Sequence, residues 1–459
     1  MNKYYKMLDF ETIISKIAKN FKTKKGIELF QKSELYKDYE KFSSERKLYE
    51  QYFNYSTVYG YISFVEMEDI SLILKYFEKN GNVSIENIKE IYNLIINTKI
   101  SNDYFTSLKN EKELIALFEK ISNLSSLKDK INSIFDKEFN VKDSASDNLL
   151  SIRIKIKTNE NLLKDKILDE LNRYSVYLNS NNYLFKNSTY VLPFKTSYKN
   201  KINGMIVDIS DSGETTFIVP SSCIEINNKI YNLKKEETNE IKRILSDLGK
   251  FILTYKNELI NNEYVISKID LINSKCIYGF SIKGNYIPTL NNSHINLIDA
   301  IHPLLNNSVI ISNSLLMDES KRQLIISGPN AGGKTVFLKM VGLLILMNQF
   351  NIPIPCNKDS SLGFFKNIFI EIGDSQSIES NLSTFSSHII NIKNILNAVK
   401  KNDLVLIDEL GNGTDPKEGE SLALAICKYL KDSECKSLIT SHFNLLKSYS
   451  LTSGSVLCG

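Results

Sequence analysis

The stretch that decides the fold runs from Leu324 to Met340 and reads LIISGPNAGGKTVFLKM. A short apolar run leads into a glycine-rich turn, and an apolar helical pattern follows the turn. The turn fits G-x-x-x-x-G-K-[ST], in which glycines let backbone N–H groups point inward around phosphate groups. The order strand, loop, helix is the context that this pattern requires. The stretch therefore predicts a nucleotide-binding α/β domain.

Each position of this turn has an expected role. Lys334 would reach the β- and γ-phosphate oxygens, and the hydroxyl of Thr335 would ligate Mg²⁺. ATP and Mg²⁺ are therefore the expected cofactors. The residues expected to surround the phosphates are Gly328, Pro329, Asn330, Ala331, Gly332, Gly333, Lys334 and Thr335.

A second motif, LVLIDEL, supplies the acids that nucleotide hydrolysis needs. Leu404 to Ile407 form a short apolar strand that ends in Asp408 and Glu409. Asp408 would hold Mg²⁺, usually through water, and Glu409 is placed to polarise the attacking water. Such a strand is common by itself, but after a phosphate-binding loop it is the expected partner.

Two further polar segments contain residues that could contact the γ-phosphate. SLITSHF places Ser441 and His442 at the end of another strand, where His442 is expected to sense or stabilise the γ-phosphate. ESNLSTFSSHI is a polar turn that opens a helix, with Ser383 near its start. Helix N-termini attract phosphate, but by itself this segment indicates only a capped helix.

The chain before these motifs is mostly helical. No proline occurs before Pro193 and glycines are rare there, which favours helices. Apolar residues at helical spacing run from Leu149 to Leu171, after a cap at Ser146 or Asp147, and a second such stripe follows residue 226. Between the stripes, β-branched and aromatic residues with Asn-Gly and Ser-Gly turns indicate a small set of hairpins.

The expected fold class is α + α/β. A mostly helical core covers residues 1–145. Long lever helices cover residues 146–297 and carry a small β-rich clamp at about 183–220. A P-loop ATPase domain, with strands that alternate with helices, covers residues 298–459.

Composition and charge exclude several classes of protein. The net charge of +4 arises from 57 basic and 53 acidic residues, which is too balanced to imply nucleic acid by itself. The N-terminus lacks the continuous apolar segment of a signal peptide, and the apolar run MVGLLILM is too short to span a bilayer, so we expect a cytoplasmic protein with no membrane partner. Lys195, Lys199 and Lys201 fit either a phosphate backbone or a solvated hairpin edge, and the local sequence favours the edge.

Taken together, GPNAGGKT, GDSQSIESNLSTFSSHI, DELGNGTDP and TSHF resemble the ATPase of the MutS family, in its second, recombination-suppressing bacterial branch. Upstream, VKDSASDNLLSIR is similar to the entry to the lever helix of that branch. The segment from VLPFK to INGMIVDISDSGETTFIVP is similar to its clamp. The resemblance covers essentially the whole chain and implies an ATP-binding-cassette-like ATPase attached to helical core, levers and clamp.

The resemblance also implies a mechanism. By motif position Asp408 supports the metal, Glu409 is the catalytic carboxylate and His442 is the strand-end sensor, while Ser383 would contact the γ-phosphate bound to a partner subunit. Such proteins act as homodimers that close on branched or structured DNA, in DNA repair and the suppression of recombination. A role at collided ribosomes, with rRNA as target, and a weakly hydrolysing regulatory form stay open as alternatives.

Two departures from the family pattern limit these expectations. No mismatch-recognition domain precedes the core. Phe64-Val65-Glu66 superficially resembles the mismatch-reading wedge, but it is expected to lie in a helical region, where it is a chance match or serves core packing. The ATPase segment is shorter at its C-terminal end than the family pattern. The nuclease-like Smr module and nuclease activity are therefore not expected, and dimerisation is in doubt.

Overall fold

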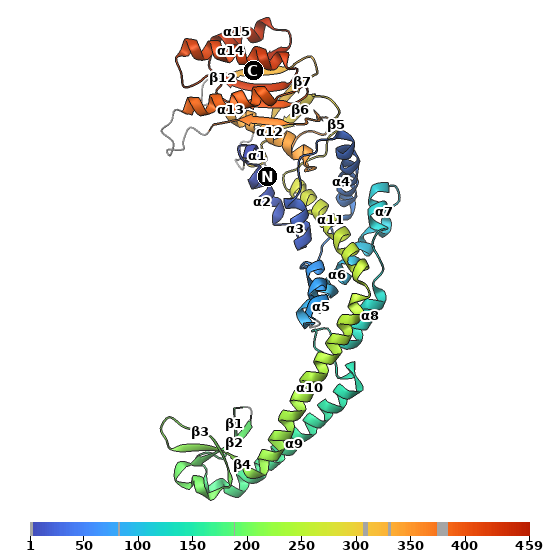
Figure 1. Ribbon diagram of the computed structural model, residues 1–459, viewed down its shortest axis with the longest axis vertical. Coiled ribbons are helices and arrows are strands. Elements are labelled where there is room, and N and C mark those ends of the chain that lie inside the picture. Colours follow the sequence, from blue (N-terminus) through green and yellow to red (C-terminus); the bar gives the residue numbers. More distant parts are fainter. Residues whose placement is uncertain (1–2, 81–82, 188, 306–310, 329–331, 374–383) are drawn as a thin grey trace. The chain divides into compact units, whose positions relative to one another are not determined.

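The computed structural model describes residues 3–80, 83–187, 189–305, 311–328, 332–373 and 384–459 (Figure 1). Contacts within the chain divide it into two compact units. The first unit comprises Met1–Asp69, Ile96–Ile121 and Asn261–Gly459, and the second comprises Ile70–Ile95 and Ser122–Ile260. The mixed α/β fold is confirmed, and the three-part division at residues 145 and 297 remains a prediction.

Helices of 4 to 21 residues precede the sheets of the first unit in the sequence. Side-chain caps fix the N-terminal ends of two of these helices. Thr23 Oγ1 accepts from Gly26 N at 3.1 Å at the start of α3, and Asp38 Oδ1 accepts from Lys41 N at 2.9 Å at the start of α4. The helices here are α1 (Lys3–Lys6), α2 (Phe10–Ala18), α3 (Lys24–Gln31), α4 (Tyr39–Tyr59) and α7 (Lys112–Phe118). Helices α6 (Ile85–Tyr104) and α11 (Lys256–Ser281) each contribute residues to both units.

A five-stranded parallel sheet forms the centre of the first unit. Its order is β10-β11-β12-β8-β13, and every neighbouring pair is parallel. Because the carboxyl ends of parallel strands meet at one edge, the segments that follow β8, β11 and β12 come together there. The strands are β8 (Gln323–Ser327), β10 (Ile368–Glu371), β11 (Leu404–Ile407), β12 (Lys436–Ser441) and β13 (Val456–Cys458).

Helices cover both faces of this sheet, and its strand β11 (LVLI) is a continuous apolar run, as burial on both faces favours. Leu404 and Leu406 of β11 pack in one apolar cluster with α12, whereas Val405 and Ile407 pack in another with α13, α14 and α15. The four helices are α12 (Lys334–Gln349), α13 (Thr384–Ala398), α14 (Pro416–Asp432) and α15 (Asn444–Thr452).

A second, mixed sheet of order β5-β9-β6-β7 joins the same core. Ile295, Leu297 and Met317 from this sheet are fully or almost fully buried in the cluster that also contains α12. The strands are β5 (Thr289–Leu290), β6 (Ile295–Ala300), β7 (Asn313–Met317) and β9 (Ser361–Gly363).

Two long helices dominate the second unit. Helices α9 (Asp147–Tyr174) and α10 (Ser221–Leu253) lie side by side in Figure 1, with Ile152, Ile156 and Leu233 buried together. Ser146 caps α9, since its Oγ accepts from Leu149 N at 3.1 Å. Both helices predicted from apolar spacing are confirmed. Helices α5 (Ile70–Asn80) and α8 (Ser125–Ile134) complete this unit.

A small antiparallel sheet lies between α9 and α10 in the sequence, as the turn signals predict. Its order is β1-β2-β4-β3, and a six-residue 3₁₀ segment, Thr196–Lys201, follows β2. Phe194 and Val191 are fully buried in its core. The strands are β1 (Leu184–Lys186), β2 (Thr189–Lys195), β3 (Gly204–Ile209) and β4 (Thr215–Pro220).

The segment around Phe64 corrects one expectation. Residues 60–66 form neither helix nor strand, and Asn97 holds this segment, since its side-chain Oδ1 accepts from Val65 N at 2.8 Å and its Nδ2 donates to Val65 O at 2.9 Å. Phe64 is 5% exposed, so its expected role in core packing is confirmed. Among the described helices, none has the length and apolar content that crossing a membrane requires.

Candidate functional site

The glycine-rich loop links β8 to α12, as the sequence predicts. Gly328 (φ 151°) and Gly333 (φ 78°) both have positive φ, which glycine adopts without steric cost. A Cβ atom built on either residue would meet no atom of the described residues within 4 Å. Gly332 is exposed, and Pro329, Asn330 and Ala331 lie outside the described residues.

Helix α12 begins with the two polar side chains of the motif. Lys334 is 7% exposed, and its Nζ donates a hydrogen bond to the backbone oxygen of Gly328. The ammonium group therefore lies over the loop that precedes its own helix. Free backbone N–H groups at a helix N-terminus favour an anion at the same place.

Asp408 connects the glycine-rich loop to the neighbouring strands. Thr335 Oγ1 donates to Asp408 Oδ2 at 2.7 Å, across 73 residues of sequence. Thr440 Oγ1 donates to the other carboxylate oxygen, Oδ1. Asp408 is 8% exposed, so a nearly buried carboxylate joins β11, β12 and the start of α12. We call Thr335, Asp408, Glu409 and Thr440 the strand-end cluster.

Glu409 has an unusual backbone and an exposed side chain. Its φ is 50°, in the left-handed region, which is uncommon for residues other than glycine and recurs at functional sites. Its backbone N–H donates to Thr440 Oγ1 at 2.8 Å. Asn412 Nδ2 donates to Glu409 Oε2 at 2.9 Å, which orients the carboxylate. Hydrogen bonds on both sides therefore hold this conformation.

The remaining predicted site residues have different positions. His442 follows β12 directly and is exposed to solvent, and Ser383 lies outside the described residues. Sequence reasoning missed Thr440, which bonds to both Asp408 and the backbone of Glu409. The available signal was a threonine, one residue before the end of the strand and directly after the apolar pair Leu438 and Ile439.

The donors of the strand-end cluster suit a hard cation. Mg²⁺ prefers oxygen ligands and usually binds through one or two carboxylates, several waters and the phosphates of a substrate. Thr335 and Asp408 supply a hydroxyl and a carboxylate within 2.7 Å of each other. Within the described ranges, no group of three or more His, Cys, Asp or Glu side chains could hold a metal. These residues therefore suit a Mg²⁺ ion whose coordination shell would be completed by phosphate oxygens.

A cavity of about 920 Å³ opens beside the glycine-rich loop. Its lining combines apolar side chains of α12 and β7, such as Phe337, Met340 and Leu315, with Lys334 and Gly328. Ligand sites commonly have this character, mostly apolar with a few polar groups. The cavity thus offers an apolar surface next to a cationic one, which suits a molecule with a ring and an anionic group.

Comparison with known proteins supports this picture. The family model described as MutS domain V matches residues 324–456. Proteins named Endonuclease MutS2 are similar over most of the chain: 38% identity over 388 residues in Streptococcus thermophilus (84% of this chain, 49% of the relative). The values are 37% over 399 residues in Clostridium perfringens (86% and 50%) and 34% over 459 residues in Fusobacterium nucleatum (98% and 58%). The chain is MutS2-like.

The MutS2-like chain spans 49 to 58% of the length of these curated relatives. The matched residues 324–456 contain the glycine-rich loop, the strand-end cluster and His442. The site built from the structure and the region shared with the MutS family therefore coincide.

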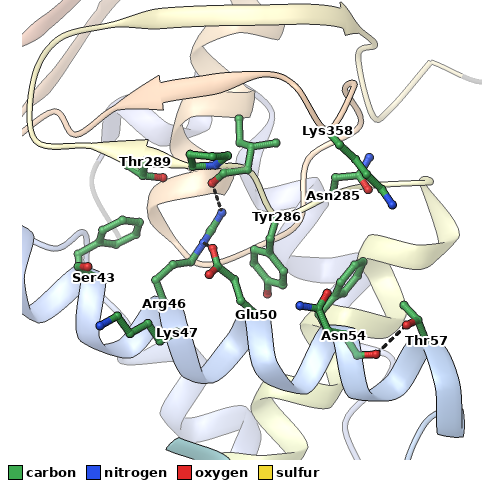
Figure 2. Close-up of a pocket in the computed structure, with 14 residues that line it drawn as sticks. Ser43, Arg46, Lys47, Glu50, Asn54, Thr57, Asn285, Tyr286, Thr289 and Lys358 are labelled. Atoms are coloured by element: carbon green, nitrogen blue, oxygen red, sulfur yellow. Dashed lines mark hydrogen bonds and ion pairs between the residues drawn. The ribbon is translucent and has the colours of Figure 1, made fainter. Parts of the chain in front are cut away.

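A second pocket of the MutS2-like chain lies mostly outside the matched region (Figure 2). It encloses about 590 Å³ between α4 and the segment 285–289. Its buried cation, Arg46, is 4% exposed and makes five hydrogen bonds, to Glu50, Ile287, Asn348 and Asn351. The guanidinium also lies 4.3 Å from the ring centre of Tyr286. Because every N–H of Arg46 is used within the protein, this arginine is structural.

Proposed function

We propose that this MutS2-like chain is an ATP-dependent DNA-binding protein of the MutS family. ATP binding and hydrolysis at the strand-end cluster would drive clamping on branched or structured DNA, in DNA repair and suppression of recombination. One observation carries the proposal: the hydroxyl of Thr335 and the carboxylate of Asp408, from two separate motifs, are hydrogen-bonded at 2.7 Å. Similarity to MutS proteins supports it independently.

The proposed ATPase domain is ATP-binding-cassette-like. Strand β12 lies between β8, which leads into the glycine-rich loop, and β11, which leads into Asp408. This order lets Thr440 reach both Asp408 and Glu409 from the intervening strand. The arrangement supports a site assembled from three strand ends rather than from one loop.

Each residue of the cluster has a proposed task. Lys334 and the loop N–H groups would bind phosphate, and Thr335 and Asp408 would hold Mg²⁺, which neutralises charge on the phosphates. Glu409 would orient and polarise the attacking water, because its carboxylate is exposed and held by Asn412. Thr440 would fix the angle between the two acids.

A homodimer would complete this site. Ser383 is proposed to contact the γ-phosphate bound to the partner subunit, and His442 to act as the sensor within its own subunit. ATP would then bind at the interface of two copies, so that binding favours the closed dimer.

The small sheet is the proposed DNA contact. Lys199 and Lys201 are exposed in the 3₁₀ segment after β2, and Lys195 at the end of β2 is half-buried. Lysines contact DNA phosphates without reading sequence, which matches a target recognised by its shape.

Substitution of Glu409 tests the proposal. Glu409→Gln should lower the rate of ATP hydrolysis about 10²- to 10⁴-fold, the usual contribution of a general base, and leave ATP affinity unchanged. Glu418→Gln, an exposed acid in the first turn of α14, is the matched control. Wild-type protein should also bind a four-way DNA junction more tightly than a linear duplex of equal length. The proposal fails if concentrated wild type shows no turnover, or if junction and duplex bind equally.

A further inference from the structure

A buried lysine of α11 lines a small cavity in the first unit. The cavity encloses about 270 Å³ and is bordered by α3, α4, α11 and the residue that follows α12. Lys275 is 3% exposed, whereas two other lining residues, Glu34 and Tyr264, are exposed to solvent. The cavity therefore leads from the surface of the protein to a buried amine. Apart from Phe350, its lining lies outside residues 324–456, which match the MutS family model.

The amine of Lys275 is surrounded by a carbonyl group and two aromatic rings. Its Nζ donates to the backbone oxygen of Phe350 at 2.7 Å. The ring centres of Tyr49 and Phe30 lie 4.8 and 5.6 Å from the same nitrogen. Among the residues that the structure describes, no acidic side chain forms an ion pair with it. Buried lysines are usually paired, so this environment is unusual for a charged amine.

The neighbouring charges do not offset the cost of burying the ammonium form. Burial lowers the pKa of Lys275 to about 7, and the positive charge of Arg46 acts in the same direction, whereas Glu45 and Cys276 oppose the shift. Glu45 is bonded to another group, because Tyr36 Oη donates to its Oε2 at 2.9 Å. At neutral pH about half of the amine is therefore uncharged, and an uncharged amine is a nucleophile.

A purely structural role for Lys275 would be to attach α11 to the end of α12. That role uses one N–H of the amine and requires no cavity beside the side chain. The cavity instead leaves room for a group bonded to Nζ, and Leu29, Leu271 and Phe350 give it apolar walls. An acylated Nζ keeps one N–H for the backbone oxygen of Phe350 and carries no charge. Acylation would thus preserve the hydrogen bond and remove the cost of burying a charge.

We propose that Lys275 is an acylation site: its amine takes a small acyl group from an acyl phosphate, and the cavity holds the acyl chain. The Nζ lone pair attacks the carbonyl carbon, a C–N bond forms, and the C–O bond to phosphate breaks. Phosphate leaves with the electron pair of that bond and one amine proton passes to water, so nothing is oxidised or reduced. The volume of the cavity restricts the donor to a small molecule.

Labelling of the folded protein with acetyl phosphate tests the proposal. The protein is treated at pH 7 and digested, and peptide mass spectrometry measures the acetylated fraction of each lysine against time. Lys275 should react about 10-fold faster than Lys358, an exposed lysine of the same unit, because an exposed amine is almost entirely charged at this pH. Lys275→Arg keeps an N–H donor for Phe350 and should leave the rate at Lys358 unchanged.

Two further measurements test the amine and the cavity separately. From pH 7 to 9 the rate at Lys275 should rise only about 2-fold, because its amine is already half uncharged, whereas the rate at Lys358 should rise about 100-fold. Leu29→Trp, which fills part of the cavity, should slow acetylation of Lys275 and not of Lys358. Leu445→Trp, at a residue of α15 that is 40% exposed and outside the cavity lining, is the matched control.

Fast labelling of Lys275 with a shallow pH dependence supports the acylation site. The site is overturned if Lys275 stays unlabelled while Lys358 reacts, or if both rates rise equally with pH, since Lys275 then reacts as an ordinary amine. Equal labelling of Lys275 in Leu29→Trp and Leu445→Trp would also overturn it, because the acyl group would not enter the cavity. None of these measurements involves ATP or DNA, so they decide the acylation site independently of the proposed function.

Discussion

The strand-end cluster of the first unit and the small sheet of the second unit use polar residues in opposite ways. In the cluster, Asp408 is 8% exposed and both of its carboxylate oxygens accept hydrogen bonds from threonines. In the small sheet, Lys199 and Lys201 are exposed, and five of the six residues of strand β3 are exposed as well. The cluster thus shields Asp408 from water, whereas the small sheet exposes Lys199 and Lys201 to it.

This difference indicates how each region would respond to change. A buried and bonded polar group has fixed geometry, and its loss leaves the partner groups unsatisfied, so single substitutions should have large effects. Exposed charges interact weakly, are screened by salt and act in sum. The comparison predicts a few strong sites in the parallel sheet and many weak ones on the small sheet.

The largest effect is expected at Asp408. Asp408→Asn removes the charge that faces Thr335 and should lower ATP turnover about 10²- to 10³-fold, as loss of one preorganised electrostatic group does. A titration of Mg²⁺ at saturating ATP checks the cause, since the variant should need more metal. Asp415→Asn is the control, because Asp415 is an exposed cap of α14 and asparagine caps a helix equally well. Equal turnover in both variants would remove Asp408 from the proposed site.

The core of the small sheet gives the next largest effect. Phe194 is fully buried, and Phe194→Ala should lower the stability of the second unit by about 3–5 kcal/mol. ATP turnover without DNA should not change, since the strand-end cluster belongs to the first unit. Chemical denaturation followed by circular dichroism, together with turnover, checks both statements. Phe185→Ala, at a residue that is 65% exposed, should change stability by less than about 0.5 kcal/mol.

A buried lysine outside the cluster gives a pH-dependent effect. Burial lowers the pKa of Lys275 to about 7, and its Nζ donates to Phe350 O at 2.7 Å. Between pH 7 and the usual lysine value of about 10.4 the unfolded chain binds more protons, so stability should rise by about 1.4 kcal/mol per pH unit. Below pH 7 the lysine is charged in both the folded and the unfolded chain, so the full cost of burying its charge lowers the stability. Lys275→Met should remove this rise, whereas Lys358→Met, at an exposed residue, should keep it.

Denaturation curves of wild type and Lys275→Met at pH 7, 8 and 9 provide the measurement. The difference between their unfolding free energies should change by about 2–3 kcal/mol over this range. Parallel pH dependences would mean that Lys275 keeps an ordinary pKa in the folded protein.

The smallest effect is expected from the lysines of the small sheet. Changing Lys195, Lys199 and Lys201 to Gln should reduce the slope of log K for DNA against log salt by about 1 for each phosphate that is no longer neutralised. Binding measured from 50 to 200 mM salt checks the slope. Lys130→Gln with Lys137→Gln, two exposed residues of the second unit outside the sheet, should leave it unchanged. An unchanged slope in the triple variant would show that the sheet does not touch phosphate.

Much of the fold could be predicted because its signals are local. Apolar spacing predicted helices α9 and α10, turn residues predicted the strands between them, and the glycine pattern predicted the junction of β8 and α12. The error at Phe64 has a non-local cause. The side chain of Asn97, about thirty residues later, bonds to both backbone polar groups of Val65, and no local pattern near Phe64 reports these bonds.

The site was harder to predict than the elements that carry it. The apolar run predicted that Asp408 and Glu409 lie at the end of a strand. It could not predict that Thr440 lies beside them, because the order of strands in a sheet does not follow from local sequence. The same limit hid the cavity beside Lys275, whose walls come from different elements. The roles of Lys334, Glu409, His442 and Ser383 remain predictions, and Glu409→Gln tests one of them.

Helix α12 is anchored at both of its ends. At its start, Thr335 is bonded to Asp408, and at its end the side chain of Asn348 accepts from Arg46 at 2.9 Å. Gln349 also exchanges two hydrogen bonds with the backbone of Phe365. With 16 residues, the helix is about 24 Å long, and all of its residues from Met340 to Gln349 are buried. Helix α12 therefore connects the glycine-rich loop rigidly to α4. A tilt of the helix at the loop must either break its hydrogen bonds to Arg46 or move α4 with it.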